Sequence, residues 1–163
     1  MVKREIRIKQ QKRTAYLQPI LFPSVQWVLK DWGAWTRHLP ALSDFENPLD
    51  QSYCPEEWYI SDDHAFLLER ELKQLERYDA FICGCLTRYY LVRNMTLRDL
   101  SRQKNINKNR LSAILRMGES WLHRGAHTWV DPLYAEYLRW QKEKARRETR
   151  VKNIVDSLSR QEV

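Results

Sequence analysis

The spacing of hydrophobic positions predicts helices along most of the chain. In the stretch "SVQWVLKDWGAWTRH" an apolar face recurs at helical intervals, so we expect a first helix from Ser24, its N-cap, to about Arg37. The residues that share this face are Val28, Trp32 and Trp35.

A second helical segment is predicted from Ser61, with Asp62 and Asp63 in its first turn, where carboxylates favour the positive end of the helix dipole. Its apolar stripe is Ala65, Leu68, Leu72 and Leu75. After a bend near Arg77 the stripe continues through Phe81, Ile82, Cys85, Leu86 and Tyr89 to a corner at Arg93 and Asn94.

The sequence of the C-terminal third predicts one more helix. "HRGAHTWVDP" looks like a connector, and Asp131 followed by Pro132 is typical of a helix start, because aspartate caps and proline fits the first helical position. We expect this helix to reach about Ser159 and to project from the core, since "KEKARRETR" offers little to bury.

Three regions therefore make up the expected all-α architecture, a compact helical domain with two extensions. They are a basic N-terminal arm over residues 1–23, a helical core over 24–130, and a basic C-terminal helix over 131–163. The proline-rich segment "LPALSDFENPLDQSYCPEEW" predicts a long loop, and only the short "REIRIK" alternates as a strand does.

The core contains a predicted helix-turn-helix at residues 96–122. Thr96 can cap the first helix, and Leu100, small Ser101 and Ile106 supply the crossing that this motif requires. Asparagine at the turn tolerates a left-handed backbone, and a second asparagine can cap the next helix; these residues are Asn105 and Asn107. The inward face of the second helix is expected to be Leu111, Ile114, Leu115 and Leu122.

This assignment leaves the basic side of the second helix facing outward, with small side chains on it that allow a close approach. The early part of the second helix enters the DNA major groove in this motif, where arginine can pair with guanine and asparagine with adenine. The expected base-reading residues are Lys108, Asn109, Arg110, Ser112, Ala113 and Arg116, and the expected phosphate contacts are Arg88, Arg98, Arg102 and Lys104.

Charge segregation supports a polyanionic partner. The chain carries a net charge of +7, yet residues 44–79 hold eleven acids against three bases, and residues 88–124 hold nine bases against two acids. Further basic clusters lie at 1–13 and 139–152. Blocks of this kind suit phosphate neutralisation, and double-stranded DNA is the expected partner, although a solvated charged surface would also explain charge alone.

Other site classes are weaker. Asp62, Asp63 and His64 could form a metal-dependent nuclease site, but a capped helix start explains "SDDH" as well. Cys54, Cys83 and Cys85 lack zinc spacing and are expected to be reduced thiols, the last two buried. We expect Trp27, Trp32, Trp58 and Trp121 to lie in the core. No catalytic signature, cofactor motif, signal peptide or membrane span is predicted, so we expect a cytoplasmic protein that is not an enzyme.

Two stretches together resemble a known family. "VLKDWGAWTRH" and "ERYDAFICGCLTRYYLVRNMTLRDLSRQKNINKNRLSAILRMGESWL" are similar to the antitermination protein Q of lambda-like phages, with a layout like the phage 21 type. The second stretch also resembles region 4 of bacterial sigma factors. The matches cover somewhat under half of the chain, and the basic arm and C-terminal helix have no counterpart that we can match.

The resemblance implies a specific activity. Proteins of this family bind DNA beside a phage late promoter, load onto paused host RNA polymerase, contact sigma, and suppress pausing and termination. It implies double-stranded DNA and RNA polymerase with sigma as partners, in a bacterial host cell, with nascent RNA a further candidate. The alternative is a sigma-like regulator that acts only at initiation.

Overall fold

The computed structural model describes residues 21–39 and 56–162, and these ranges form five helices. In chain order they are α2 (Pro23–Arg37), α4 (Asp62–Tyr78), α5 (Ala80–Leu91), α6 (Leu97–Lys104) and α7 (Lys108–Gln161). The all-α class is confirmed for these ranges, which contain no strand. The predicted N-terminal arm up to residue 20, the "REIRIK" strand within it and loop residues 40–55 lie outside them.

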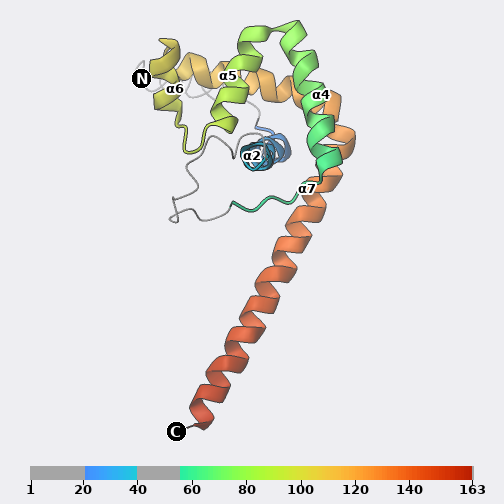
Figure 1. The fold of residues 1–163 in the computed structure, drawn as a ribbon, viewed down its shortest axis with the longest axis vertical. Helices are drawn as coiled ribbons and strands as arrows, with labels where there is room; N and C mark the ends of the chain where they lie inside the picture. The colour runs from blue at the N-terminus through green and yellow to red at the C-terminus, as the bar shows by residue number, and fades with distance from the viewer. Residues whose placement is uncertain (1–20, 40–55, 163) are drawn as a thin grey trace, which may run out of the picture.

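Helix α2 forms the centre of the fold. Figure 1 shows it end-on, with α4, α5 and α7 around it, and all three contact it. The predicted apolar face is buried, and its main members are Val25, Val28, Leu29, Trp32 and Trp35. A Cβ atom added to Gly33 would lie 2.2 Å from the carbonyl oxygen of Tyr90, so the close approach of α2 to α5 requires glycine there.

The predicted N-cap of α2 is wrong. The helix begins at Pro23, with Phe22 as N-cap and no capping side chain. Proline suits this first turn because its missing N–H would have had no partner in the helix. Ser24 is instead buried, and its hydroxyl donates to Oδ1 of Asp131 at 2.7 Å, which ties the start of α2 to α7.

Helices α4 and α5 follow the prediction closely. Ser61 caps α4, where its hydroxyl accepts the backbone N–H of His64 at 3.3 Å. The bend falls at Asp79, two residues beyond the predicted position, and the Asp79 carboxylate accepts from the first N–H groups of α5 at 3.1 Å. Cys83 and Cys85 are buried, as expected.

The predicted connector at 123–132 is wrong, because α7 runs through it as one helix of 54 residues. Asp131 lies inside the helix and is not an N-cap. Its Oδ1 accepts from the Ser24 hydroxyl, and its Oδ2 lies 3.1 Å from Nε2 of His123. Pro132 removes one helical hydrogen bond, a common cause of kinks, and Figure 1 shows α7 changing direction beside α4. Burial of Ala126, Val130 and Leu133 around the proline favours the continuous helix.

Beyond this change of direction α7 leaves the core. An aromatic cluster of Trp27, Tyr59, Tyr137 and Trp140 holds its root, with ring centroids 4.7 Å apart for Trp27 and Tyr137 and 5.4 Å apart for Tyr59 and Trp140. Every residue of 138–162, which we call the distal arm, is exposed, and Figure 1 shows the arm standing clear of the other helices. The predicted projection is confirmed.

Two further expectations concern apolar side chains. Of the four tryptophans expected in the core, Trp32 is buried and Trp27 and Trp121 are partly buried, whereas Trp58 is 41% exposed and that expectation is wrong. Within residues 21–39 and 56–162, none of the helices has the apolar length that crossing a bilayer demands.

Candidate nucleic-acid interface

Helix α6 starts with a complete capping box. The Thr96 hydroxyl accepts the N–H of Asp99 at 3.1 Å, and the Asp99 carboxylate accepts the N–H of Thr96 at 3.3 Å. The Thr96 hydroxyl also donates to the Asp99 carboxylate at 2.8 Å, and this bond, with the one from the Thr96 N–H, holds the pKa of Asp99 below its ordinary value. The predicted cap is confirmed, and it gains a carboxylate partner that the prediction did not include.

The turn after α6 has the predicted left-handed residue. Asn105 adopts φ 53° and ψ 47°, and the N–H groups of Asn105 and Ile106 donate to the carbonyls of Arg102 and Ser101 at 3.3 and 3.1 Å. This pair of bonds is the Schellman ending of a helix. The Ser101 hydroxyl donates to the carbonyl oxygen of Ile106, so the small residue of the crossing also fastens the turn.

Helix α7 then begins under the predicted cap and packs by the predicted face. The Asn107 side chain accepts the N–H of Asn109 at 2.8 Å. Leu100 of α6 is fully buried, as are Leu111, Leu115 and Leu122 of α7, while Ile114 packs partly buried against them. The rotation of α7 about its own axis is thereby fixed.

That rotation exposes most of the predicted base-reading residues. Lys108, Asn109, Arg110 and Ala113 are exposed, and Ser112 is partly exposed. The first turn of α7 contains no acid. The result is a cationic, low-relief helical surface in front of a buried leucine face, which is a shape that a DNA major groove can admit.

Arg116 lies differently from the other five residues. Its guanidinium donates from one terminal nitrogen to both carboxylate oxygens of Glu119, at 2.7 and 2.5 Å, and its side chain is 24% exposed. Arg116 is therefore engaged within the fold, and its base contact stays a prediction.

Glu119 is the centre of a buried network that sequence reasoning missed. Its side chain is 1% exposed and accepts, besides Arg116, the Tyr90 hydroxyl at 2.9 Å and the Gln26 amide at 3.2 Å. Burial, together with the adjacent carboxylate, raises the pKa of Tyr90. The network joins α2, α5 and α7, and so positions the N-terminal part of α7, which contains the predicted base-reading residues. One signal was available, because Glu119 lies four residues after buried Leu115 on the inward face.

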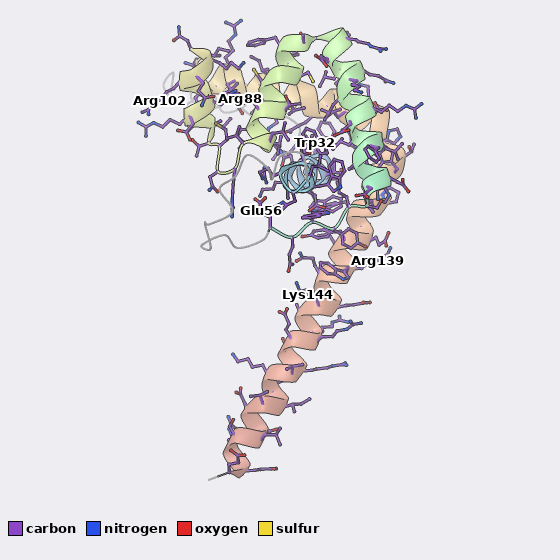
Figure 2. All side chains as sticks on the ribbon, in the orientation of Figure 1. Trp32, Glu56, Arg88, Arg102, Arg139 and Lys144 are labelled. Atoms are coloured by element: carbon purple, nitrogen blue, oxygen red, sulfur yellow. The ribbon has the colours of Figure 1, made fainter. Side chains whose placement is uncertain are left out.

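The predicted phosphate contacts surround α6. Arg88, Arg98, Arg102 and Lys104 are all exposed. Arg88 is also oriented by Gln103, whose amide oxygen accepts from Nε of the arginine at 2.6 Å. Figure 2 shows Arg88 and Arg102 at the end of the molecule where α6 lies. Three of the four cations lie on α6 itself and Arg88 lies on α5, the helix before it, and their contacts with phosphates stay a prediction.

Comparison of this chain with protein-family models, with curated proteins and with solved structures finds no match. The candidate interface therefore rests on the geometry of α6 and the start of α7.

The competing metal site has a different geometry. Ser61 caps α4 and lies 2.8 Å from Nδ1 of His64, and the Asp62 carboxylate accepts Nε1–H of Trp35 at 2.8 Å. Within the described ranges no three histidine, cysteine or acidic side chains gather as a metal site would require. "SDDH" thus has a structural role at a helix start.

A second hydrogen-bonded cluster holds α2 against α5. Arg37 forms a two-pronged pair with Glu56 at 2.9 and 3.0 Å, and it also donates to the last carbonyls of α5, those of Tyr90 and Leu91, at 3.0 and 2.8 Å. The hydrogen bonds from Arg37 lower the pKa of Glu56. Arg37 therefore fixes the end of the helix that precedes the hairpin.

A cleft of about 590 Å³ lies away from the hairpin, at the root of the distal arm. Aromatic rings line it, and Lys144 of the same chain already lies 5.2 Å above the Trp140 ring and 3.7 Å from Glu57. We assign no ligand to it.

Proposed function

We propose that the protein binds double-stranded DNA through a helix-turn-helix formed by α6 and the start of α7. The observation that carries the proposal is the acid-free, exposed face of Lys108, Asn109, Arg110, Ser112 and Ala113 on a helix whose rotation is fixed by buried leucines. Base edges would be read from this face, and the cations around α6 would grip phosphates on either side.

We further propose that this DNA binding serves late-gene transcription antitermination of the phage Q type. The support is the resemblance of the WGAW segment and of the stretch from α5 to α7, together with a sigma region 4-like layout. On this proposal the protein engages host RNA polymerase and its sigma factor, and suppresses pausing and termination. It acts as a binding factor and not as an enzyme.

The distribution of charge supports two separate surfaces. Residues 56–79 hold eight acids against three bases. Helix α4, within this range, also exposes Phe66 and Leu67, by 58% and 38%. In Figure 1, α4 and α6 lie on opposite sides of the core. An acidic, partly apolar surface suits a protein partner while the basic hairpin faces DNA.

Two single substitutions test the DNA interface. Arg110→Ala should cost about 1–3 kcal/mol of specific binding and relax sequence preference at one position, because it removes a base contact. Lys104→Ala should weaken binding to all sequences alike and reduce the salt dependence by about one phosphate contact. Footprinting and titration on candidate late-promoter DNA measure both. Parent-like binding by both variants would reject the docking.

A read-through assay separates antitermination from the promoter-only alternative. Purified RNA polymerase transcribes a template with terminators at increasing distances from the promoter, with and without the protein. Read-through that persists at distant terminators supports antitermination. Altered initiation with unchanged termination would instead favour a sigma-like regulator.

A further inference from the structure

We propose that the distal arm carries a second, sequence-independent contact surface for double-stranded DNA. The surface is a stripe formed by Arg139, Lys142, Arg146 and Arg150, which we call the basic stripe. The inference goes beyond the proposed function of the hairpin and does not depend on it.

The positions of these four residues put them on one side of α7. Their separations of three and four residues match the 3.6-residue helical turn, so they fall within a sector of about 80° and span roughly 16 Å along the axis. Asn153, Ser157 and Arg160 extend the same sector toward the C-terminus. Of the four acids of the arm, Glu148 and Glu162 lie on the opposite side of the helix, Asp156 lies beyond one edge of the sector, and Glu143 borders the other edge at about 20° from it.

Three of the four stripe residues are also free of internal partners, whereas Arg139, at the root of the arm, interacts electrostatically with Tyr59. The side chains of Lys142, Arg146 and Arg150 form no ion pair or hydrogen bond with any of the residues that the structure describes. All three are fully on the exposed arm, past the aromatic cluster that holds its root. Figure 2 shows the side chains of the arm spread into open space beyond Lys144. Unpaired cations at regular spacing suit the phosphates of a nucleic acid.

The shape of the arm favours duplex DNA as the polyanion. A single exposed helix can lie in or along the wide major groove of DNA, whereas the major groove of duplex RNA is deep and narrow. An anionic membrane fits less well, because it requires an apolar face opposite the cations along the same turns. Here the exposed large apolar residues beside the dense part of the basic stripe are Leu138 and Trp140 at its start, and the run of Val151, Ile154, Val155 and Leu158 begins only where that part ends.

The position of the stripe separates it from the hairpin. In Figure 1 the core and the change of direction of α7 lie between α6 and the distal arm. The stripe would therefore contact a different duplex segment from the one that the hairpin reads, which requires either a bend in the DNA or a second duplex.

The test compares two double variants of the full-length protein that lose the same charge from the same helix. The stripe variant is Arg146→Gln/Arg150→Gln. The control variant is Arg147→Gln/Lys152→Gln, which removes two equally exposed cations from other sides of the arm. Binding to a labelled duplex of arbitrary sequence is measured by anisotropy over a series of salt concentrations, and circular dichroism checks that helicity is equal.

The stripe variant should bind at least about tenfold more weakly at 0.1 M salt, and the slope of log K against log salt should fall by about 2, as for two lost phosphate contacts. The control variant should change the slope by less than half as much. Equal effects of the two variants, or none from either, would overturn the proposal. So would a stripe variant that keeps its DNA affinity but loses binding to duplex RNA or to anionic phospholipid vesicles.

Repeating the measurement in a Lys108→Ala/Arg110→Ala background separates the two proposals. The effect of the stripe should persist in that background, because the hairpin no longer contributes. If the background substitutions themselves leave specific binding unchanged, the hairpin proposal is wrong. The stripe proposal is still decided by the comparison of the stripe variant with the control variant.

Discussion

Replacing Glu119 by alanine should strongly destabilise the protein. The substitution leaves a largely buried Arg116 guanidinium without its carboxylate, and it removes the acceptors for Tyr90 and Gln26. Breaking a buried ion pair in this way costs about 3–5 kcal/mol. For a chain of this size each kcal/mol lowers the melting temperature by about 2–4 °C, so a fall of roughly 6–20 °C is expected. Thermal and urea unfolding followed by circular dichroism measure it.

The control for this prediction is Glu148→Ala, since Glu148 is exposed on the distal arm and should change stability by less than about 0.5 kcal/mol. A third variant, Arg116→Met/Glu119→Leu/Tyr90→Phe, replaces the charged network by apolar groups of similar size. It should recover most of the lost stability, because the buried charges and the Tyr90 hydroxyl are removed together and only the partly buried Gln26 amide loses its acceptor. A triple variant as unstable as Glu119→Ala would refute this account of the network.

The same triple variant tests the role of Arg116 in DNA binding. If Arg116 acts only by holding α7 in place, the refolded triple variant should keep the sequence preference of the parent protein. A change in preference at one base pair, with stability restored, would show that Arg116 reaches a base after all.

The remaining predictions concern backbone geometry and pH. Gly33→Ala should destabilise the protein by roughly 1–3 kcal/mol or more, because the added Cβ would meet the Tyr90 carbonyl. Gly84→Ala should instead stabilise α5 by about 0.5–1 kcal/mol, because the added Cβ would meet nothing within 4 Å. Urea unfolding measures both. Asn105→Ala should lower the free energy of unfolding by about 1 kcal/mol and weaken specific DNA binding. Asn105→Gly should do neither, because glycine adopts this left-handed turn without strain. Equal effects of the two substitutions would contradict the reasoning. Glu56→Gln should lower stability at about pH 7 and match the parent once the pH has fallen below the folded pKa of Glu56. A carboxyl whose folded pKa is lowered stabilises the protein above its ordinary value of 4.5 and loses that contribution as pH falls through the folded pKa. A difference that is constant with pH would exclude the Arg37 pair as its cause.

Local patterns predicted the hairpin well because its determinants are local. The Thr96 cap, the left-handed Asn105 and the Asn107 cap each depend on residues within four positions, and all three are in place. The buried leucines of α7 follow equally from helical spacing.

The errors arose where distant contacts override local preference. Asp131 and Pro132 would start a helix in isolation, but burial of their neighbours, with the Ser24 hydroxyl bound to Asp131, keeps α7 continuous through them. Two partners of Glu119 come from α2 and α5, 93 and 29 residues away, so the local pattern could place Glu119 on the inward face but could not identify these partners. Arg116 is a different case, because Glu119 lies only three residues away, and helical spacing offered this pair without showing that the carboxylate is buried.

The continuity of α7 makes the molecule a lever. The helix that would lie in the groove also carries the distal arm. The N-terminal part of α7 and the arm therefore move together, except for bending at Pro132. The arm extends roughly 36 Å, so a tilt of about 10° alone sweeps its tip sideways by about 6 Å relative to its root, and the additional length of α7 back to the hairpin increases that displacement. Small adjustments in how the hairpin seats on its duplex would thus be transmitted mechanically to whatever lies at the far end.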